Sequence, residues 1–292
     1  MKKFRIYGFL FIVLVFIACS EDNEVGDVPA LTPEYTLPQG GSPADDRIVA
    51  FYNKYGTYIL YDYLETDLKW MQTDVNNTWT NYSYTSPDIR YVGDMLDLLD
   101  KIWFRFYPEE FHKKFLPYKI FLTSTLTYNN GSGGVNNYNS RVVQSQMVIS
   151  NCSEILTTLS DETKLRLKRD IQNSLWGSWL NEFSIPKEFY KVSDYNGVAS
   201  ADPENWNYAR ERGFVADDKG KEWSAVDPWP SRTLNQATDL SYFLDGMRNR
   251  TSEEWLEDLK YPLVKKKYDI LRNYFLINFN FDIQAIGDAR EF

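Results

Sequence analysis

The chain has 292 residues, with 41 acidic and 32 basic side chains and a formal net charge of -9. Its basic residues form no block of the kind that binds nucleic acid, so we expect no nucleic-acid partner. Its only histidine is His112, which excludes any metal site that needs two imidazoles and limits a Ser-His-Asp triad to this one residue.

The first nineteen residues form a secretion signal. Lys2, Lys3 and Arg5 precede an apolar run over residues 6–18, which is shorter than the roughly 20 residues of a membrane-spanning helix. Cys19 follows the run directly, as in a bacterial lipoprotein signal, where this thiol carries the lipid and becomes the first residue after cleavage. The alternative is an ordinary signal with an incidental cysteine.

Cleavage before Cys19 removes three positive charges and takes the formal charge from -9 to -12. Cys152 is then the only thiol without a lipid, so no intramolecular disulfide is expected. Residues 20–24 are acidic and resemble a tag for export to the outer face of the outer membrane. We expect a signal peptide over residues 1–18, a flexible tether over 19–44 and one folded domain over 45–292.

The first half of this domain mixes helices and strands. Helical spacing predicts a helix over residues 46–55 ended by Gly56. Further expected elements are a strand at 57–61, an irregular or hairpin connection at 74–86, a helix at 88–106, strands at 119–126 and 141–149, and a mobile loop at 129–139.

The second half is expected to contain four helices and one long, mostly irregular segment. Ser160 caps a long amphipathic helix over residues 160–182, whose apolar residues recur every four positions. These are Leu167, Ile171, Leu175, Trp179 and Phe183. Residues 187–235 are expected to be mostly loop, and helices are expected at 236–248, 252–258 and 262–276. The elements together predict a helix-rich α+β fold with a small mixed sheet.

Several segments resemble, in order, a family of zinc metallopeptidase lipoproteins encoded beside SusC/SusD-type outer-membrane nutrient importers. They are residues 51–60 (FYNKYGTYIL), 116–120 (LPYKI), 185–189 (IPKEF), 213–215 (GFV), 274–275 (YF) and 281–283 (FDI). The resemblance implies a zincin-like fold, an outer-membrane location exposed at the cell surface, and a SusC/SusD-type transporter as partner.

The metal-binding motif of that family is missing. In H-E-x-x-H, two histidines one helical turn apart bind zinc and the glutamate activates a water. The resemblance places this motif near Asn173, Ser174 and Gly177, in a helix without histidine. From the family's later acidic helix only Asp239 remains as a possible ligand. We therefore predict an inactive relative without a metal or other cofactor, which binds a peptide or glycan without cutting it.

Two alternatives stay open. The first is a dedicated glycan-binding lipoprotein, with ring stacking by Trp206, Tyr208, Trp223 and Trp229. The second is a hydrolase that uses a pair of carboxylates in a cleft and no zinc. For His112, which lies between charged residues, we expect a surface position without a catalytic role.

Overall fold

A computed structural model describes residues 34–72, 82–129, 133–197, 199–216 and 235–292. The chain divides into the units Met1–Thr36 and Leu37–Phe292, and nearly all described residues belong to the second. Packing begins before residue 45. The Gln39 side chain donates to the Ile59 carbonyl and accepts from the Tyr61 amide, both at 3.0 Å. The Tyr61 hydroxyl donates to Asp45 at 2.6 Å.

The second unit is a helix-rich α+β fold, which confirms the predicted fold class. Its helices are α1 (Asp45–Tyr55), α2 (Val92–Ile102), α3 (Glu109–Phe115), α4 (Asp161–Trp179), α5 (Lys187–Lys191), α6 (Gln236–Asn249), α7 (Pro262–Phe279) and α8 (Ile283–Asp288). Its strands are β1 (Tyr58–Leu60), β2 (Tyr82–Thr85), β3 (Lys119–Leu122), β4 (Thr125–Asn129), β5 (Val135–Asn137), β6 (Ser140–Val143) and β7 (Gln146–Ile149).

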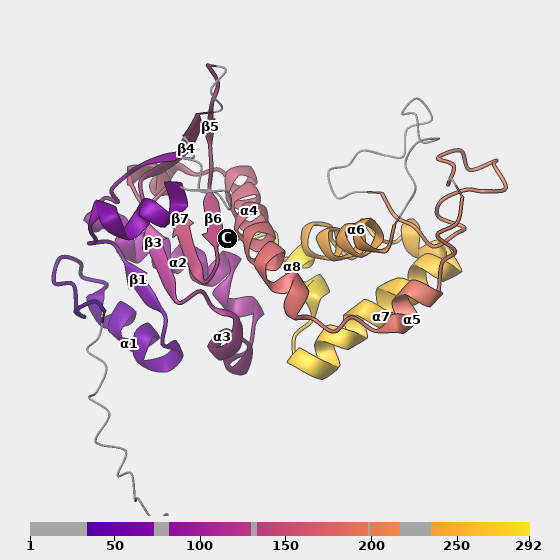
Figure 1. The fold of residues 1–292 in the computed structure, drawn as a ribbon, viewed down its shortest axis with the longest axis horizontal. Coiled ribbons are helices and arrows are strands. Elements are labelled where there is room, and N and C mark those ends of the chain that lie inside the picture. Colours follow the sequence, from indigo (N-terminus) through magenta and orange to yellow (C-terminus); the bar gives the residue numbers. More distant parts are fainter. Residues whose placement is uncertain (1–33, 73–81, 130–132, 198, 217–234) are drawn as a thin grey trace, which may run out of the picture. The chain divides into compact units, whose positions relative to one another are not determined.

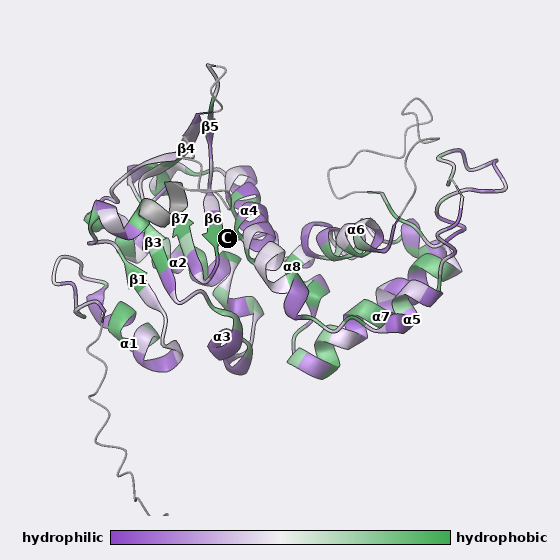
Figure 2. Cartoon of the chain, viewed as in Figure 1, coloured by the Kyte–Doolittle hydropathy of each residue, from purple (hydrophilic) through white to green (hydrophobic). Residues whose placement is uncertain are grey.

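The larger sheet has the order β1-β3-β7-β6 (Figure 1). The first three strands are parallel, and β6 pairs with β7 in the antiparallel direction. All residues of β1 and β3 are buried, as expected for strands covered on both faces. The apolar colouring of β1, β3 and β7 shows the same property (Figure 2). A smaller antiparallel sheet has the order β2-β4-β5.

Two segments that the sequence predicts as single strands are in fact two strands each. The 119–126 segment leaves the large sheet after β3 and enters the small one as β4. At the change, the Thr123 amide bonds to Ile149 and the Ser124 amide bonds to Thr85. The 141–149 segment is the hairpin β6–β7, in which Gln144 takes a φ of 54°. The predicted loop at 129–139 also contains β5.

The predicted helices at 46–55, 160–182, 236–248 and 262–276 are confirmed. Gly56 ends α1 with a φ of 71°, and the Ser160 hydroxyl accepts the Thr163 amide at the start of α4. The predicted 88–106 helix is shorter, because 3-10 turns flank α2 on both sides. The predicted 252–258 helix is wrong, since turns lie there.

The core joins the sheet to the helical second half. The apolar stripe of α4 is buried as predicted. Trp176 donates its indole N–H to the Tyr107 hydroxyl at 2.8 Å, and Tyr107 donates to Gln172 at 2.5 Å. These contacts fix the rotation of α4, which lies alongside β6 (Figure 1). Ser140 Oγ and Ser174 Oγ are 2.9 Å apart across this junction.

Candidate functional site

Three of the four predicted former metal-site positions lie on α4 outside its buried apolar stripe. Asn173 and Gly177 are exposed and one turn apart, and Ser174 is half-buried. The space around Gly177 is open, because a Cβ atom added there would meet no atom within 4 Å. Asn173 and Gly177 have the four-residue spacing of a two-ligand helical motif, but neither residue has the side chain of such a ligand.

Arg248 of α6 lies against this part of α4. Its Nη2 atom donates to Asn173 Oδ1 at 3.0 Å and forms an ion pair with Asp245. Its guanidinium lies 4.5 Å from the centre of the Trp176 ring, a cation–π distance. The side chain is 2% exposed. A fixed positive charge thus contacts the amide of Asn173, the position where the resemblance predicts the first metal ligand.

Asp239, the fourth position, points to a different set of partners. Its Oδ2 atom lies 2.7 Å from Lys267 Nζ of α7 and accepts the Tyr195 hydroxyl at 2.5 Å. Burial is the main influence on both charged groups: it raises the pKa of Asp239 and lowers the pKa of Lys267. Their mutual attraction opposes both shifts.

Lys267 Nζ also lies within cation–π distance of four aromatic rings. They belong to Phe189, Tyr195, Phe214 and Phe243, with 4.5 Å to the nearest ring centre, that of Phe214. Asp239 therefore neutralises a lysine in an aromatic surrounding through Oδ2, while its Oδ1 is buried without a hydrogen-bond partner among the described residues.

These residues do not fit a zinc ion. A catalytic zinc site needs about three nitrogen, sulfur or carboxylate ligands and an open position for water. The Asn173 amide oxygen accepts from a guanidinium, Gly177 has no donor, and Asp239 is bound to an ammonium group. Over the described parts of the chain, no group of three His, Cys, Asp or Glu residues has a metal-binding arrangement.

The predicted stacking residues differ in their surroundings. Trp206 is 91% exposed, so its ring is open to a ligand. Tyr208 is buried: its hydroxyl accepts from Arg210 at 2.6 Å and its ring lies 5.7 Å from that of Tyr261. Trp223 and Trp229 lie outside the described residues.

The expected surface position of His112 is wrong. The residue is 4% exposed, and its Nε2 lies 2.8 Å from the Phe104 carbonyl. Rings of Tyr55, Phe104 and Tyr107 surround the imidazole. Burial lowers the pKa of His112, which favours the neutral form. The charged neighbours in sequence misled the prediction, because α3 turns them outward and His112 inward.

A groove between α1 and α2 was not predicted. It has a volume of about 380 Å³ and is lined by Arg47, Phe51, Tyr55, Ile59, Leu96, Asp97, Asp100, Lys101 and Phe104. The Phe51 ring lies 4.8 Å from that of Tyr55 and 4.9 Å from that of Phe104. Its sequence signal was the spacing of Arg47, Phe51 and Tyr55, which lie four residues apart on α1.

Charged side chains surround this aromatic wall. Arg47 Nη2 lies 2.8 Å from Asp97 Oδ1, and both side chains are about half exposed or more, at 48% and 63%. Asp97 and Asp100 are the two carboxylates of the groove. The groove therefore combines an apolar wall with charged groups that can orient a ligand. Asp97 is already paired with Arg47.

Comparison with known proteins gives one structural likeness. No protein-family model and no curated protein matches the chain. The fold is similar to the crystal structure of a candidate zinc-binding metallo-peptidase from Bacteroides caccae, with a TM-score of 0.46 and 10% sequence identity. The likeness covers 84% of this chain and 88% of that chain. At this similarity it carries no weight for ligands or activity.

The predicted lipid-anchor position lies outside the described residues. Cys19 and the whole of residues 1–33 are not among the described residues. In the described part of the chain, no helix has the length and apolar character needed to cross a membrane.

Proposed function

We propose that the protein is a cell-surface lipoprotein that binds a peptide or glycan without cutting it. It would be an inactive relative of the metallopeptidase-like lipoproteins and an accessory component of a SusC/SusD-type uptake system in the outer membrane. The lipid on Cys19 would hold it at the membrane. The tether expected over residues 19–44 would end before Gln39, because Gln39 already bonds to Ile59 and Tyr61.

One observation carries the binding function: the groove between α1 and α2. Its volume lies in the range of small-molecule sites, about 300–1,000 Å³. Flat aromatic faces suit the apolar side of a sugar ring or an aromatic side chain of a peptide. Arg47, Asp97, Asp100 and Lys101 supply hydrogen-bond donors and acceptors around this wall.

The predicted absence of cleavage has separate support. The family's mechanism requires a zinc-bound water, and Asn173, Gly177 and Asp239 do not provide the ligands. Arg248 and Lys267 place two positive charges against the residues that would have to bind a divalent cation.

A panel of peptides and oligosaccharides tests the proposal by affinity electrophoresis and calorimetry. Phe51→Leu keeps an apolar side chain but removes a ring, so we expect at least tenfold weaker binding to the preferred ligand. Ile277→Ala is the matched control, because Ile277 is 81% exposed on α7 and outside the groove. Binding that Phe51→Leu leaves unchanged, or chelator-sensitive cleavage of any peptide, would refute the proposal.

The exposed ring of Trp206 favours a second candidate, a dedicated glycan-binding protein that uses the 199–208 segment. This candidate predicts that Trp206→Ala abolishes retardation on a polysaccharide, whereas Phe51→Leu does not. The reverse pattern would assign binding to the groove. The remaining alternative is a hydrolase that uses two carboxylates without zinc. If it is correct, the protein should release reducing sugar from a glycan, and Asp100→Asn should abolish this release.

A further inference from the structure

A second pocket lies on α4, about two turns before the Asn173 region. It has a volume of about 210 Å³ and is lined by Glu162, Leu165, Arg166, Lys168, Arg169, Asn249 and Arg290. Four of these seven side chains are cationic and one is acidic. The sequence brings three of the cations together on α4, and the fold adds Arg290 from the C-terminal segment. We call this site the basic pocket.

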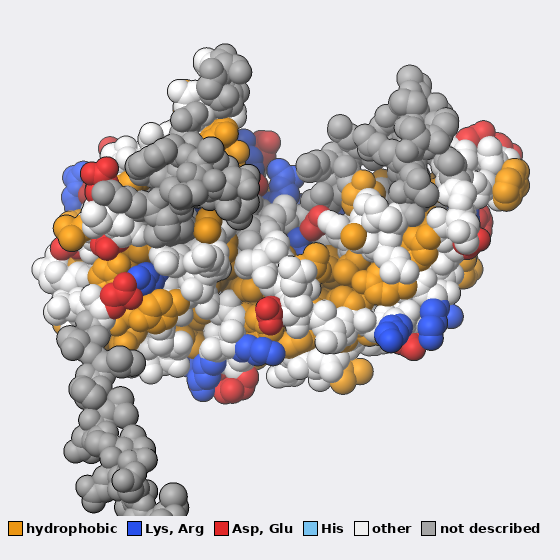
Figure 3. All heavy atoms as spheres, viewed as in Figure 1, with side chains coloured by type: hydrophobic (Ala, Val, Ile, Leu, Met, Phe, Trp, Pro, Cys, Tyr) orange, Lys and Arg blue, Asp and Glu red, His pale blue; other side chains and the backbone are white. Residues whose placement is uncertain are grey.

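Its charge contrasts with the rest of the protein. The formal net charge is -9, and acidic and basic side chains are interspersed on the face shown in Figure 3. Elsewhere in the described parts of the chain, several cations have a carboxylate partner, such as Arg47 with Asp97 and Arg272 with Asp282, and within the pocket Arg290 pairs with Glu254. Among the described residues, no carboxylate pairs with Arg166 or Arg169. A concave site with an excess of positive charge, here four cations to one lining carboxylate, concentrates anions.

Lys168 is held in a fixed position at the pocket. It is 2% exposed, and its Nζ donates to the carbonyls of Ile286 at 2.5 Å and Ala289 at 2.7 Å. Burial, with smaller contributions from Arg290 and Arg105, lowers the pKa of Lys168 to about 7. Burial is the largest cause, and only the smaller repulsion from the two arginines is of the kind that a bound anion would reduce.

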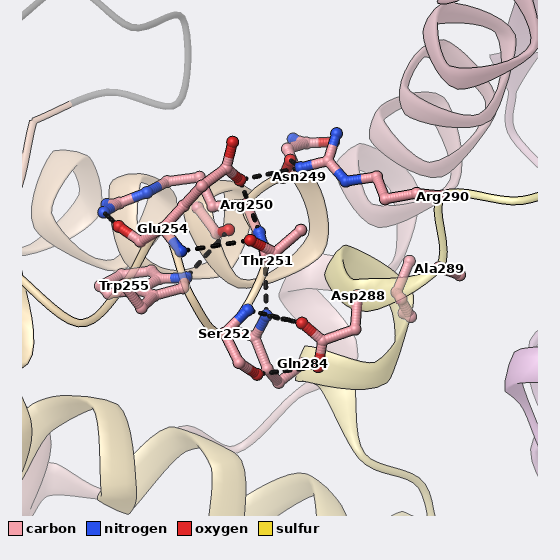
Figure 4. Close-up of polar contacts among 12 residues, drawn as sticks. Asn249, Arg250, Thr251, Ser252, Glu254, Trp255, Gln284, Asp288, Ala289 and Arg290 are labelled. Carbon is pink, nitrogen blue, oxygen red and sulfur yellow. Dashed lines mark hydrogen bonds and ion pairs between the residues drawn. The ribbon is translucent and has the colours of Figure 1, made fainter. Parts of the chain in front are cut away.

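Arg290 is held from the opposite side. Its Nη2 donates to the Asn249 carbonyl at 2.9 Å and to Glu254 Oε2 at 2.8 Å (Figure 4). Its Nε is buried and has no hydrogen-bond partner among the described residues. Polar contacts of Thr251 with Glu254, and of Ser252 with Asp288, hold the surrounding backbone (Figure 4). The guanidinium is therefore fixed by neighbours, which reduces the ordering cost of binding.

We propose that the basic pocket binds a single tetrahedral oxyanion, the sulfate or phosphate ester of a larger ligand. Guanidinium groups present N–H donors in a planar fork that matches such oxygens, and three of the four cations are arginines. The volume is several times the roughly 30 Å³ that one water molecule occupies in the liquid, so one oxyanion with a few waters fits. The site is separate from the α1–α2 groove, and the inference does not depend on the function proposed for it.

Calorimetry of the full mature chain tests the inference. The probes are sodium sulfate, phenyl phosphate, an O-sulfated monosaccharide, and vesicles with and without phosphatidylglycerol, all at equal ionic strength. The test variant is Arg166→Ala/Arg169→Ala. The control is Lys265→Ala/Lys266→Ala, which removes the same charge from exposed positions on α7. Circular dichroism checks that both variants are folded.

We expect saturable binding of at least one small ester, weakened tenfold or more in the test variant and unchanged in the control. Binding to anionic vesicles alone, with the same loss, would support the site and identify a lipid headgroup as its source. Equal weakening in both variants would overturn the inference, because binding would then depend on net charge and not on the pocket. The absence of binding to every probe would also overturn it.

Discussion

Lys267 Nζ lies 2.7 Å from Asp239 Oδ2, and both side chains are almost completely buried, at 0% and 1% exposure. The last carboxylate of the expected metal site therefore has a lysine ammonium as its cation. Two buried charges are costly to remove from water unless they remain paired. This pair consequently links α6 to α7, so it should contribute to the stability of their packing.

Lys267→Met should destabilise the fold by about 3–5 kcal/mol, because it leaves the Asp239 charge buried without its partner. The double variant Lys267→Met/Asp239→Asn should lose clearly less, since no charge is then stranded. Urea denaturation measures both. Lys265→Met is the control: Lys265 and Asp269 are 57% and 47% exposed, so its effect should stay within about 0.5 kcal/mol. A double variant that loses the sum of both single losses would contradict this account.

Two glycines give opposite predictions for the same substitution. Gly177→Ala should stabilise the protein by about 0.5–1 kcal/mol, because Gly177 lies in α4 with open space around it. Gly246→Ala should destabilise it by about 1–3 kcal/mol, because the new Cβ would lie 2.8 Å from the Trp255 ring. Thermal unfolding compares the two. Equal effects would show that α4 and α6 pack differently from this description.

The lowered pKa of Lys168 implies that the free energy of unfolding depends on pH. Its folded-state pKa of about 7 lies below the ordinary value of 10.5, so the unfolded chain binds more protons between these pH values. Stability from this group should rise with pH over that window, by at most about 1.4 kcal/mol per pH unit. Lys168→Met should lose this slope when unfolding is measured at pH 6, 7, 8 and 9. If wild type and variant show the same dependence of stability on pH, that dependence comes from other titratable groups and this prediction is wrong.

Cys19 predicts the membrane attachment. Cys19→Ala should prevent lipidation, so metabolic labelling with a fatty acid should disappear and the protein should leave the detergent phase. Acyl chains contribute roughly 0.8 kcal/mol per buried methylene, which makes the difference large. Cys152→Ala is the control, because Cys152 is buried and free. Labelling that persists in Cys19→Ala would contradict a lipoprotein signal.

Local signals in the sequence were sufficient for the long helices. The Ser160 cap, the four-residue stripe of α4 and the glycine after α1 each depend on neighbours within about a turn. The strand breaks were not predictable in the same way. Gln144 adopts a positive φ although it is neither glycine nor asparagine, and Thr123 changes sheets through bonds to distant residues.

The surroundings of the candidate site residues could not be predicted from the sequence, because they depend on contacts between residues far apart in the chain. The absence of imidazole near Asn173 could be read directly, but Arg248 is 75 residues away from it in sequence. The partner of Asp239 lies 28 residues further on. His112 shows the same limitation, since its charged neighbours concealed an inward-facing position. The basic pocket escaped notice because Arg290 joins Arg166 and Arg169 only after folding.

The most direct test of the central claim, that the α4–α6 region has no zinc site, is calorimetric zinc titration of the folded mature protein. We compare it with Asn173→His/Ser174→Glu/Gly177→His, which introduces two imidazoles one turn apart at exposed positions of α4. The account predicts no stoichiometric binding by the wild type and measurable binding by the variant. One zinc per wild-type chain, lost on replacing Asn173 or Asp239 with alanine, would contradict it.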